Sequence, residues 1–506
     1  MVKTVLFKTL YAFTFIVFLP LCLIFWTVLL DRSIDLPVPD WKPAAISGIA
    51  SGSILIVKGM LDLWVMGKGL PMNAFPPKKF VTGGIYTLLE HPIYFGAALL
   101  STGISLWYRS YSGLYIVTPV LILGMVSLVY GYEKEAILKT FRDTARRYRP
   151  IISIPATGKW HRPVITVFTF ILMMGYLSVV LYLFHFHFDK NIPVIISGSL
   201  AVLLIAIGYK AVWNTLRRFG EWVANSRHDW IFFGGRFRII NHSIFSGLAG
   251  AVAAGMLTYI IGEGWAVLLL GVCAILGAAL FAQFRWGNAL LLRPFGYWGA
   301  ITGGILGIIL IRIIFSIPIY QAAMAAVLCA PFTQAIGRLR CLSQGCCHGP
   351  VTSKKMGIRV WQSQSRVVAL SGLKGEFILP TQVFSILFNL LLGILLLAVW
   401  SSQQFSASFI IGLYLVLTGI ERFTEDAYRG EKQTRIAKGL RENQWIAIAV
   451  VGIGIIVTVL PSPPIKVSGE FNPALWGTAI FGGLITAFAM SMDFPKSKLK
   501  YSRLSG

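Results

Sequence analysis

The chain has 506 residues, of which 56% are hydrophobic and only 13% charged, so it is far more apolar than a soluble domain of this size needs. This composition excludes an ordinary soluble enzyme. The net charge of +25 would suggest nucleic acid in a soluble protein. Here the basic residues cluster in loops between apolar segments, so anionic lipid headgroups are the expected partner and nucleic acid is not. We therefore predict an all-α polytopic membrane protein.

About 14 segments are apolar enough to be transmembrane helices, and we expect them to form two catalytic-type bundles. The first begins with basic residues, but its apolar run is too long for a signal-peptide core, so we predict a retained helix. In chain order the segments centre on residues 5–30, 44–66, 94–107, 113–129, 164–184, 192–209, 244–261, 265–284, 297–315, 319–332, 383–400, 409–418, 445–460 and 475–490.

Two composition breaks divide the chain into three parts: residues 1–160, a two-helix spacer at 161–235, and residues 236–506. The spacer carries no recognisable chemistry. The loops alternate in charge, and the basic ones include residues 134–162, 210–238, 338–374 and 422–441. By the positive-inside rule we expect both termini and these basic loops to be cytoplasmic.

The first chemical motif is "GGIYTLLEHPIYFG", followed after a helical hairpin by "EKEAILKTFRDTARRYRP". It places a glycine-rich turn, a histidine, two tyrosines and acidic residues on one side of the membrane. A cofactor with an adenine and an amino-acid moiety would use an apolar slot, backbone donors at Gly83 and Gly84, and such polar groups. The alternative is that His91 has only a structural role at the start of a helix, because Pro92 is a common residue at the first helical position.

The motif resembles the integral-membrane methyltransferases of the isoprenylcysteine carboxyl methyltransferase and phospholipid methyltransferase superfamily. Two positions depart from the family: Glu90 stands where Arg is usual, and Lys134 replaces the first of an acidic pair, for which Glu133 could substitute. The resemblance implies an S-adenosylmethionine pocket. The residues that it implies for binding the cofactor are Gly84, Tyr86, His91, Tyr94, Gly96, Glu135 and Tyr148.

Lys58 and Asp62 are charged residues four apart in the second apolar segment. At this spacing on a helix they can neutralise each other within the membrane. We expect a structural ion pair, with a place in the active site as the alternative.

The second chemical motif is "GRLRCLSQGCCHG", residues 337–349, which follows an apolar segment and opens a long basic loop. The planar guanidinium of Arg338 can grip two phosphate oxygens at once. Gly337 and Gly349 allow close approach of a backbone to a lipid headgroup. The upstream stretch "YWGAITGGILG" and the downstream stretch "GIERFTEDAYRG" complete the pattern.

In this order the three stretches resemble bacterial prolipoprotein diacylglyceryl transferase, a family that moves a diacylglyceryl group from phosphatidylglycerol to a cysteine thiol of a lipoprotein precursor. Gly337, Arg338 and Gly349 match its signature, Arg422 matches a later arginine, and Asp426 replaces a Glu. The residues that we assign to catalysis are Arg338, Arg422, Glu425, Asp426 and Cys346. Those that we assign to substrate binding are Gly303, Gly304 and Gly349.

Four positions depart from that family: Thr302 replaces a His, Ser385 a Glu, Cys341 an Asn and Cys346 a Glu. A threonine cannot act as the general base that a neutral imidazole provides near neutral pH. The chemistry therefore needs another base, such as Glu425 or Asp426, or is a different reaction.

The membrane side of the second motif stays open at this point. The family signature faces outward, whereas the charge pattern here places the Arg338 loop inside.

Four interpretations of the cysteines in this motif also remain open. They could bind zinc, form a disulfide, provide a nucleophilic thiol near Arg338, or line a lipid-facing site as small polarizable residues. Zinc sites usually combine separated pairs of ligands, and we expect adjacent cysteines such as Cys346 and Cys347 to diverge. We therefore predict no metal.

The sequence thus predicts a multi-pass, lipid-modifying transferase of a bacterial inner membrane. We expect it to transfer a diacylglyceryl or related glyceryl group from an anionic phospholipid to a thiol or other acceptor, such as a lipoprotein precursor, coupled to S-adenosylmethionine-dependent methylation. The alternative is a lipid-binding or transport protein built on degenerate enzyme folds.

Overall fold

In the computed structural model, helices account for nearly all of the regular structure. The model describes residues 6, 9–10, 12–32, 38–69, 77–148, 150–152, 213–286, 296–401, 405–430, 436–437, 439–465 and 473–496. Within these ranges eight helices are long and apolar enough to cross a membrane, and four more apolar helices are shorter. The prediction of an all-α polytopic membrane protein is confirmed. The expected spacer helices at 164–184 and 192–209 lie outside the described residues.

The chain divides into two compact units. Unit 1 comprises residues Met1–Ile195, Leu415–Ala427 and Arg435–Val459. Unit 2 comprises Ile196–Tyr414, Tyr428–Thr434 and Leu460–Gly506. The boundaries at residues 160 and 235 stay a prediction.

Unit 1 contains the first helices of the chain, and the chain enters it again between residues 415 and 459. Its helices include α2 (Leu19–Leu30), α3 (Lys42–Gly67), α4 (Pro92–Trp107), α5 (Thr118–Leu128), α6 (Lys134–Arg147) and α16 (Glu442–Thr458). A 3-10 turn at Gly84–Thr87 precedes α4, and π-helical segments lie at Thr14–Phe18, Gly113–Val117 and Val129–Glu133. The short strands β5 (Ile436–Ala437) and β6 (Leu440–Arg441) pair antiparallel just before α16.

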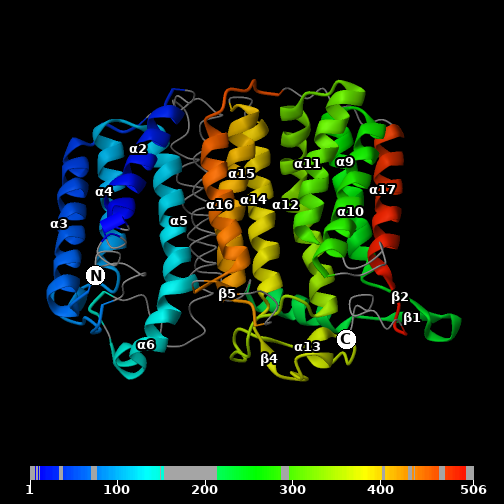
Figure 1. The fold of residues 1–506 in the computed structure, drawn as a ribbon, viewed down its shortest axis with the longest axis horizontal. Coiled ribbons are helices and arrows are strands. Elements are labelled where there is room, and N and C mark those ends of the chain that lie inside the picture. The colour runs from blue at the N-terminus through cyan, green and yellow to red at the C-terminus, as the bar shows by residue number, and fades with distance from the viewer. Residues whose placement is uncertain are drawn as a thin grey trace. The chain divides into compact units, whose positions relative to one another are not determined.

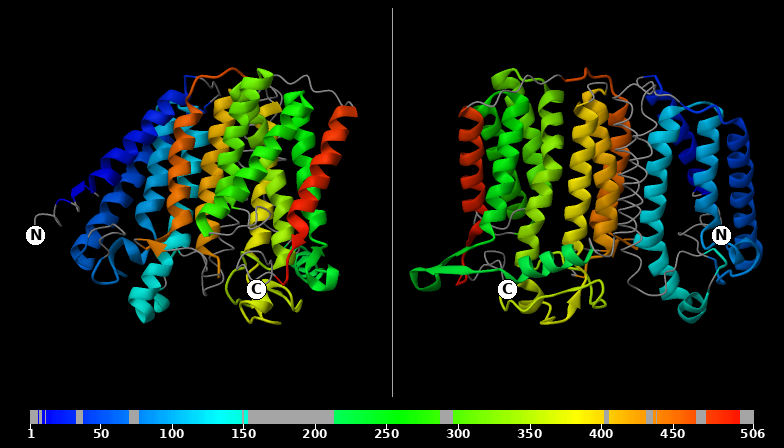
Figure 2. Two further views of the ribbon diagram at one scale, coloured as in Figure 1. Left: turned by 45° about the vertical axis from the view of Figure 1, so that its right-hand side comes forward. Right: turned by 180° about the vertical axis from the view of Figure 1, so that it is seen from behind.

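Small residues set the closest helix contact in unit 1, where α3 and α4 lie side by side (Figures 1 and 2). A Cβ added to Gly52 would lie 2.6 Å from the backbone nitrogen of Leu100, and one added to Gly96 would lie 2.8 Å from the carbonyl oxygen of Gly52. Such distances are too short for any side chain. The glycines therefore allow the two backbones to pack directly against each other, as is usual between membrane helices.

The described part of unit 2 contains six long helices, a helix at residues 213–225 and one short helix. The long helices are α9 (Ser243–Ile261), α10 (Gly264–Trp286), α11 (Tyr297–Phe315), α12 (Ile319–Gln344), α14 (Thr381–Ser401) and α17 (Pro473–Ser491), and the short one is α13 (Arg366–Ala369). Helix α15 (Ala407–Ala427) divides between the units after Tyr414. Within unit 2, α9 packs against both α17 and α12, and α12 packs against α14 (Figure 1).

Small antiparallel sheets, which the sequence analysis did not anticipate, lie at the ends of the unit 2 helices. Strands β1 (Asp229–Phe232), β2 (Phe237–Ile240) and β7 (Met492–Asp493) form one sheet, in which Arg238 lies opposite Asp493. The buried guanidinium of Arg238 contacts the carboxylates of Asp229 and Asp493, which ties the start of α9 to the end of α17. Strands β3 (Ile358–Arg359) and β4 (Phe377–Ile378) form a second pair.

Helix α12 differs most from its expected extent. The sequence predicted a helix at residues 319–332 followed by a basic loop from Arg338, but the helix continues to Gln344. Pro331 lies inside it without ending it. Its last turns stay helical because the loop 345–380 covers them: Leu342 packs in a buried cluster with Ile358, Val367 and other residues of that loop. Arg338 is therefore a helical residue.

Candidate functional site

The glycine turn of the first motif is held by an acid inside unit 1. Asp62 pairs with Lys58 at 2.8 Å, which confirms the predicted i, i+4 ion pair. The same carboxylate also accepts a hydrogen bond from the backbone N–H of Ile85 at 2.7 Å. Gly84 has a positive φ of 62°, and a Cβ there would collide with the Asp62 carboxylate. Gly84 is thus required by the turn itself, and Asp62 fixes that turn to α3.

His91 is the N-cap residue of α4 and precedes Pro92 at the first helical position. Its side chain is 24% exposed, but its Nε2 atom is buried and has no hydrogen-bond partner among the described residues. Burial lowers the pKa of His91 to about 4 despite the nearby carboxylate of Glu90. The imidazole is therefore neutral at physiological pH, and its buried nitrogen is suited to a ligand that supplies the missing hydrogen bond.

The two acids of the motif, Glu133 and Glu135, have different surroundings. The buried side chain of Glu133 accepts a hydrogen bond from the hydroxyl of Tyr94. Glu135 pairs with Lys139 at 2.8 Å, and its side chain is 53% exposed. The structure thus brings Tyr94 together with Glu133, and it does not bring Glu135 to the tyrosine.

Tyr148 closes the motif on the other side of the turn. Its hydroxyl donates to the carbonyl oxygen of Tyr86, and its ring meets that of Phe80 edge to face at 5.4 Å. Burial raises the pKa of Tyr148 to about 12 and raises that of Tyr86 as well, so both phenols stay protonated. Gly96 faces α3 and is used for the helix contact described above.

In unit 2 the guanidinium of Arg338 lies against α14. Its Nε donates to the hydroxyl of Ser385 at 3.2 Å, and Asn389 donates to the Ser385 carbonyl oxygen at 2.8 Å. Gln382, Ser385 and Asn389 are all buried and are spaced three and four residues apart, so they line one face of an otherwise apolar helix. Buried polar residues within a membrane helix are costly and usually serve function.

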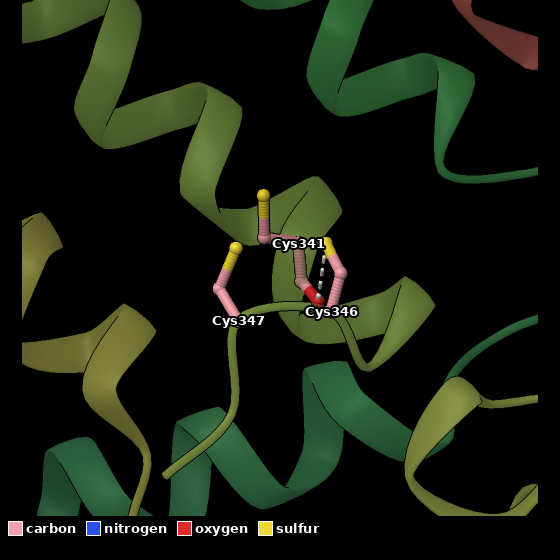
Figure 3. Close-up of side chains that lie close together, drawn as sticks. All are labelled: Cys341, Cys346 and Cys347. Atoms are coloured by element: carbon pink, nitrogen blue, oxygen red, sulfur yellow. Dashed lines mark hydrogen bonds between the residues drawn. The ribbon is translucent and has the colours of Figure 1, made fainter. Parts of the chain in front are cut away.

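Three sulfur atoms converge next to Arg338. The Sγ atoms of Cys341, Cys346 and Cys347 lie within 4.8 Å of one another, and all three side chains are partly buried (Figure 3). Cys347 has a positive φ of 60°, which turns adjacent side chains toward the same place. The expectation that Cys346 and Cys347 diverge is therefore wrong in its geometric premise.

Charges and hydrogen bonds differentiate the thiols of the two loop cysteines. Interactions with the other two cysteines, and then with Arg429 and Arg338, lower the pKa of the Cys347 thiol. Hydrogen bonding to its two neighbours and burial raise the pKa of Cys346. Cys347 is thus the thiol of the cluster that ionises first.

The loop that carries these cysteines is tied down on both sides. Gln382 donates to the carbonyl oxygen of Cys346 at 2.6 Å, and Thr381 donates to that of Cys347. The ring of His348 is buried between the carbonyl oxygen of Gly349 at 2.8 Å and the hydroxyl of Ser371 at 3.0 Å. His348 is thereby held by structural hydrogen bonds, whereas the three sulfurs lie within 4.8 Å of one another and the Cys346 thiol donates to the carbonyl oxygen of Cys341.

Two of the three predicted substrate-binding glycines lie against the protein's own backbone. A Cβ on Gly349 would lie 2.8 Å from the carbonyl oxygen of Leu379, and one on Gly303 would collide with the carbonyl of Cys273 on α10. A Cβ on Gly304 would meet nothing within 4 Å. Thr302, which stands where the resembled family has its histidine, donates to the Gly299 carbonyl oxygen at 3.1 Å.

The remaining predicted catalytic residues lie in the part of α15 that belongs to unit 1. Arg422 pairs with Glu425 at 2.7 Å, and Asn443 donates to the fully buried carboxylate of Asp426 at 3.3 Å. Arg422 and Glu425 thus contact each other near the end of α15, whereas Asp426 contacts Asn443 of α16. Their part in catalysis stays a prediction.

Sequence reasoning missed Gln382, Asn389 and Cys347 as members of the unit 2 cluster. The first two could have been found from the spacing of polar residues in "TQVFSILFN", where residues 382, 385 and 389 share one helical face. Cys347 could not, because its position depends on a backbone conformation that only glycine, asparagine and aspartate favour.

Comparison with known proteins now defines the class. The family model described as phospholipid methyltransferase matches residues 42–144, and the one described as prolipoprotein diacylglyceryl transferase matches residues 264–460. Together with the helical fold, these matches define a multi-pass membrane enzyme of the transferase class. More particularly, the chain is a fusion of a phospholipid-methyltransferase-like unit with a prolipoprotein-diacylglyceryl-transferase-like unit.

A curated relative supports the second half of this assignment. The phosphatidylglycerol–prolipoprotein diacylglyceryl transferase 2 of Clostridium perfringens (strain 13 / Type A) is 29% identical over 202 residues. The match covers 38% of this chain and 76% of the relative. The name of that relative gives its lipid and protein substrates.

Proposed function

We propose that this protein transfers a diacylglyceryl or related glyceryl group from a phosphatidylglycerol-like lipid to a thiol, at the Arg338 cluster of unit 2, in a bacterial inner membrane. The observation that carries the proposal is the placement of Arg338 beside a buried polar face of α14 and a group of three thiols. A guanidinium in partly desolvated surroundings binds a phosphodiester strongly and stabilises the negative charge that develops on the departing phosphate. The substrates named for the Clostridium relative favour the same lipid and the same kind of acceptor.

The acceptor side of the reaction needs a deprotonated thiol. Thr302 cannot supply a base, and its hydroxyl is bonded to the carbonyl of its own helix. After hydrogen bonds from the other two cysteines, Arg429 and Arg338 contribute to the lowered pKa of the Cys347 thiol, and their positive charges would act in the same direction on an incoming thiol. A lowered thiol pKa near Arg338 can thus take over part of the role of the general base that Thr302 does not provide.

Unit 1 would add S-adenosylmethionine-dependent methylation. The residues fit such a cofactor: the neutral imidazole of His91 has an unsatisfied buried nitrogen, and the Gly84 turn is fixed by Asp62. His91, Tyr94 and the Gly84 turn would hold the cofactor, while Glu133 positions the Tyr94 hydroxyl. When bound, S-adenosylmethionine supplies an electrophilic methyl group. Covalent linkage of the two units suggests that one acts on the lipid or product of the other.

The test of the transfer uses the purified full chain in vesicles of phosphatidylglycerol that is labelled in its diacylglyceryl group, with a peptide that has an N-terminal cysteine as acceptor. Label on the peptide and release of a glycerol phosphate support the proposal. Binding of phosphatidylglycerol without any transferred label would contradict it and favour a lipid-binding protein.

The test of the methylation measures binding of labelled S-adenosylmethionine to the same preparation. We expect binding that His91→Ala weakens, and Lys139→Ala, an exposed change on α6, serves as the control. An absence of binding to the wild-type chain would remove the methylation half of the proposal and leave the transfer half to its own assay.

A further inference from the structure

We infer that Cys341, Cys346 and Cys347 form a zinc site, with three thiolate ligands from the protein and a fourth coordination position open to a substrate thiol. No role in metal binding follows from the matched families or from the proposed transfer. The three Sγ atoms lie within 4.8 Å of one another and come from the end of α12 and the loop that follows it (Figure 3).

The distances suit zinc with little rearrangement. Tetrahedral zinc with Zn–S bonds of about 2.3 Å places its sulfur ligands about 3.8 Å apart. Sulfurs that already lie within 4.8 Å need to move by less than about 1 Å each to reach that spacing. Small rotations of cysteine side chains are enough, and the backbone can stay in place.

The loop is also built to hold its cysteines in this arrangement. Gln382 and Thr381 from α14 fix the carbonyl groups of Cys346 and Cys347. Cys347 keeps a left-handed backbone conformation that costs free energy of order 1–3 kcal/mol for a residue with a side chain. Strain of this kind persists where the surrounding structure imposes it, and here its result is that the Cys347 sulfur joins the other two.

The charge balance favours a divalent cation. Three thiolates and one Zn²⁺ carry a net charge of −1, and the guanidinium groups of Arg338 and Arg429 act electrostatically on Cys347. All three cysteines can be thiolates together only if a cation compensates the three negative charges that they would place in a partly buried site. Zinc reduces that charge to a value that one neighbouring arginine can balance.

The protein offers three ligands, and this leaves the fourth position for a small molecule. Because His348 is held by Gly349 and Ser371, it does not supply that ligand in this arrangement. Catalytic zinc sites usually have three protein ligands and an open fourth position, whereas structural zinc sites have four protein ligands. An open position next to Arg338 suits a thiol, because zinc binds sulfur and removes its proton.

This role of the open position rests on the proposed function. The acceptor thiol would bind zinc and lose its proton to water. Its sulfur would then form a bond to the glyceryl CH₂ carbon, while the carbon–oxygen bond to the phosphate breaks and its electron pair leaves with the glycerol phosphate. Arg338 would stabilise that leaving phosphate. Zinc would thereby provide the thiolate that the resembled family is expected to obtain with its histidine base.

The first experiment measures metal on the full chain, purified in detergent under reducing conditions. We expect one zinc per chain, and after its removal we expect Co²⁺ to bind with sulfur-to-metal charge-transfer absorption. Cys341→Ser and Cys347→Ser should each weaken binding by more than the roughly 10- to 100-fold that loss of a second-shell partner costs. Cys329→Ala, in the same helix, should bind normally. Folded variants that retain full metal affinity would overturn the site.

A second measurement uses only the wild-type chain. Zinc should protect three of its six cysteines from a maleimide, and a chelator should restore their reactivity. Equal reactivity with and without zinc would also overturn the proposal, even if every cysteine variant failed to fold.

The open position has its own test. Addition of a peptide with an N-terminal cysteine should shift the visible bands of the cobalt-loaded chain, whereas the same peptide with serine should leave them unchanged. Cobalt binding without such a shift would overturn the open position. A thiol-dependent shift without any transfer of a lipid group would overturn the proposed function while the metal site stands.

Discussion

The regions around His91 in unit 1 and Arg338 in unit 2 differ in one respect: the first has the histidine of the family pattern that it resembles, and the second does not. In unit 1 the histidine of the motif is present, neutral and left with an unsatisfied buried nitrogen. In unit 2 the corresponding histidine is Thr302, which is bonded to its own helix, and three thiols gather beside the retained arginine. Unit 1 therefore has an imidazole at its motif, whereas unit 2 has three thiols beside a guanidinium.

The largest effect should follow from removing that charge. Arg338→Ala should lower lipid-group transfer by about 10²- to 10³-fold, because one preorganised donor to a developing phosphate charge is worth that much. Arg338→Lys should retain more activity, since it keeps the charge but loses the planar fork. Arg340→Ala is the matched control in the same helix, where the arginine donates to the carbonyl oxygen of Met490. Transfer rates measured with labelled lipid decide the matter, and an unaffected Arg338→Ala enzyme would remove the guanidinium from the mechanism.

The neutral imidazole of unit 1 should make stability depend on pH. The pKa of His91 is about 4 in the folded protein and 6.5 when the residue is exposed. Between these values the unfolded chain binds a proton that the folded chain does not, so stability falls as pH decreases from about 6.5 to about 4 and this loss is complete below that range. The shift corresponds to about 3 kcal/mol.

The apparent Tm of the detergent-purified chain, followed across this pH range, tests the shift. His91→Gln should remove this part of the pH dependence, because an amide does not titrate there. If the wild type and the His91→Gln variant lose stability in parallel as the pH decreases, His91 is not buried in its neutral form.

Hydropathy and helix-start signals were sufficient to predict much of the fold. Apolar runs located the described membrane helices, Pro92 marked the start of α4, and the spacing of Lys58 and Asp62 predicted their ion pair. These features are local, since they depend on residues within one or two helical turns. The same locality explains why Arg338 suggested a loop: a charged residue after an apolar run indicates a loop unless a later segment of the chain covers it.

The contents of the second site depend on contacts that are distant in sequence. Ser385 and Gln382 reach the motif from a helix about 40 residues further on, through the side chain of Arg338 and the backbone of Cys346. The convergence of Cys346 with Cys347 depends on one positive φ angle. Neither an apolar pattern nor a motif spacing contains this information, so sequence reasoning named Arg338 and Cys346 without predicting the cluster.

Substitution of the adjacent glycines Gly303 and Gly304 can show whether this part of unit 2 is needed for helix packing or for substrate binding. Gly303→Ala should destabilise the protein by about 1–3 kcal/mol, because its Cβ would collide with the Cys273 carbonyl on α10. Gly304→Ala should leave stability unchanged or raise it by up to about 1 kcal/mol, since that Cβ meets nothing within 4 Å and alanine favours helix. The apparent Tm measures both. Loss of transfer in a stable Gly304→Ala variant would assign that glycine to the substrate.

The smallest expected effect concerns which acid serves the His91 end. Glu133→Gln should weaken S-adenosylmethionine binding by about three- to tenfold, because the Tyr94 hydroxyl loses a charged acceptor whose hydrogen bond is worth about 1.5–3 kcal/mol, part of which the amide retains. Glu135→Gln should change binding little, since Glu135 is half-exposed and pairs with Lys139. Equilibrium binding of labelled cofactor separates the two variants. If only Glu135→Gln weakened binding, the acidic position would be the one that the family pattern indicated, and α6 would have to turn toward Tyr94 when the cofactor binds. If Glu133 alone mattered, it would take the place of the first acid of the family's pair, where this chain has Lys134, while His91 keeps the imidazole of the family pattern.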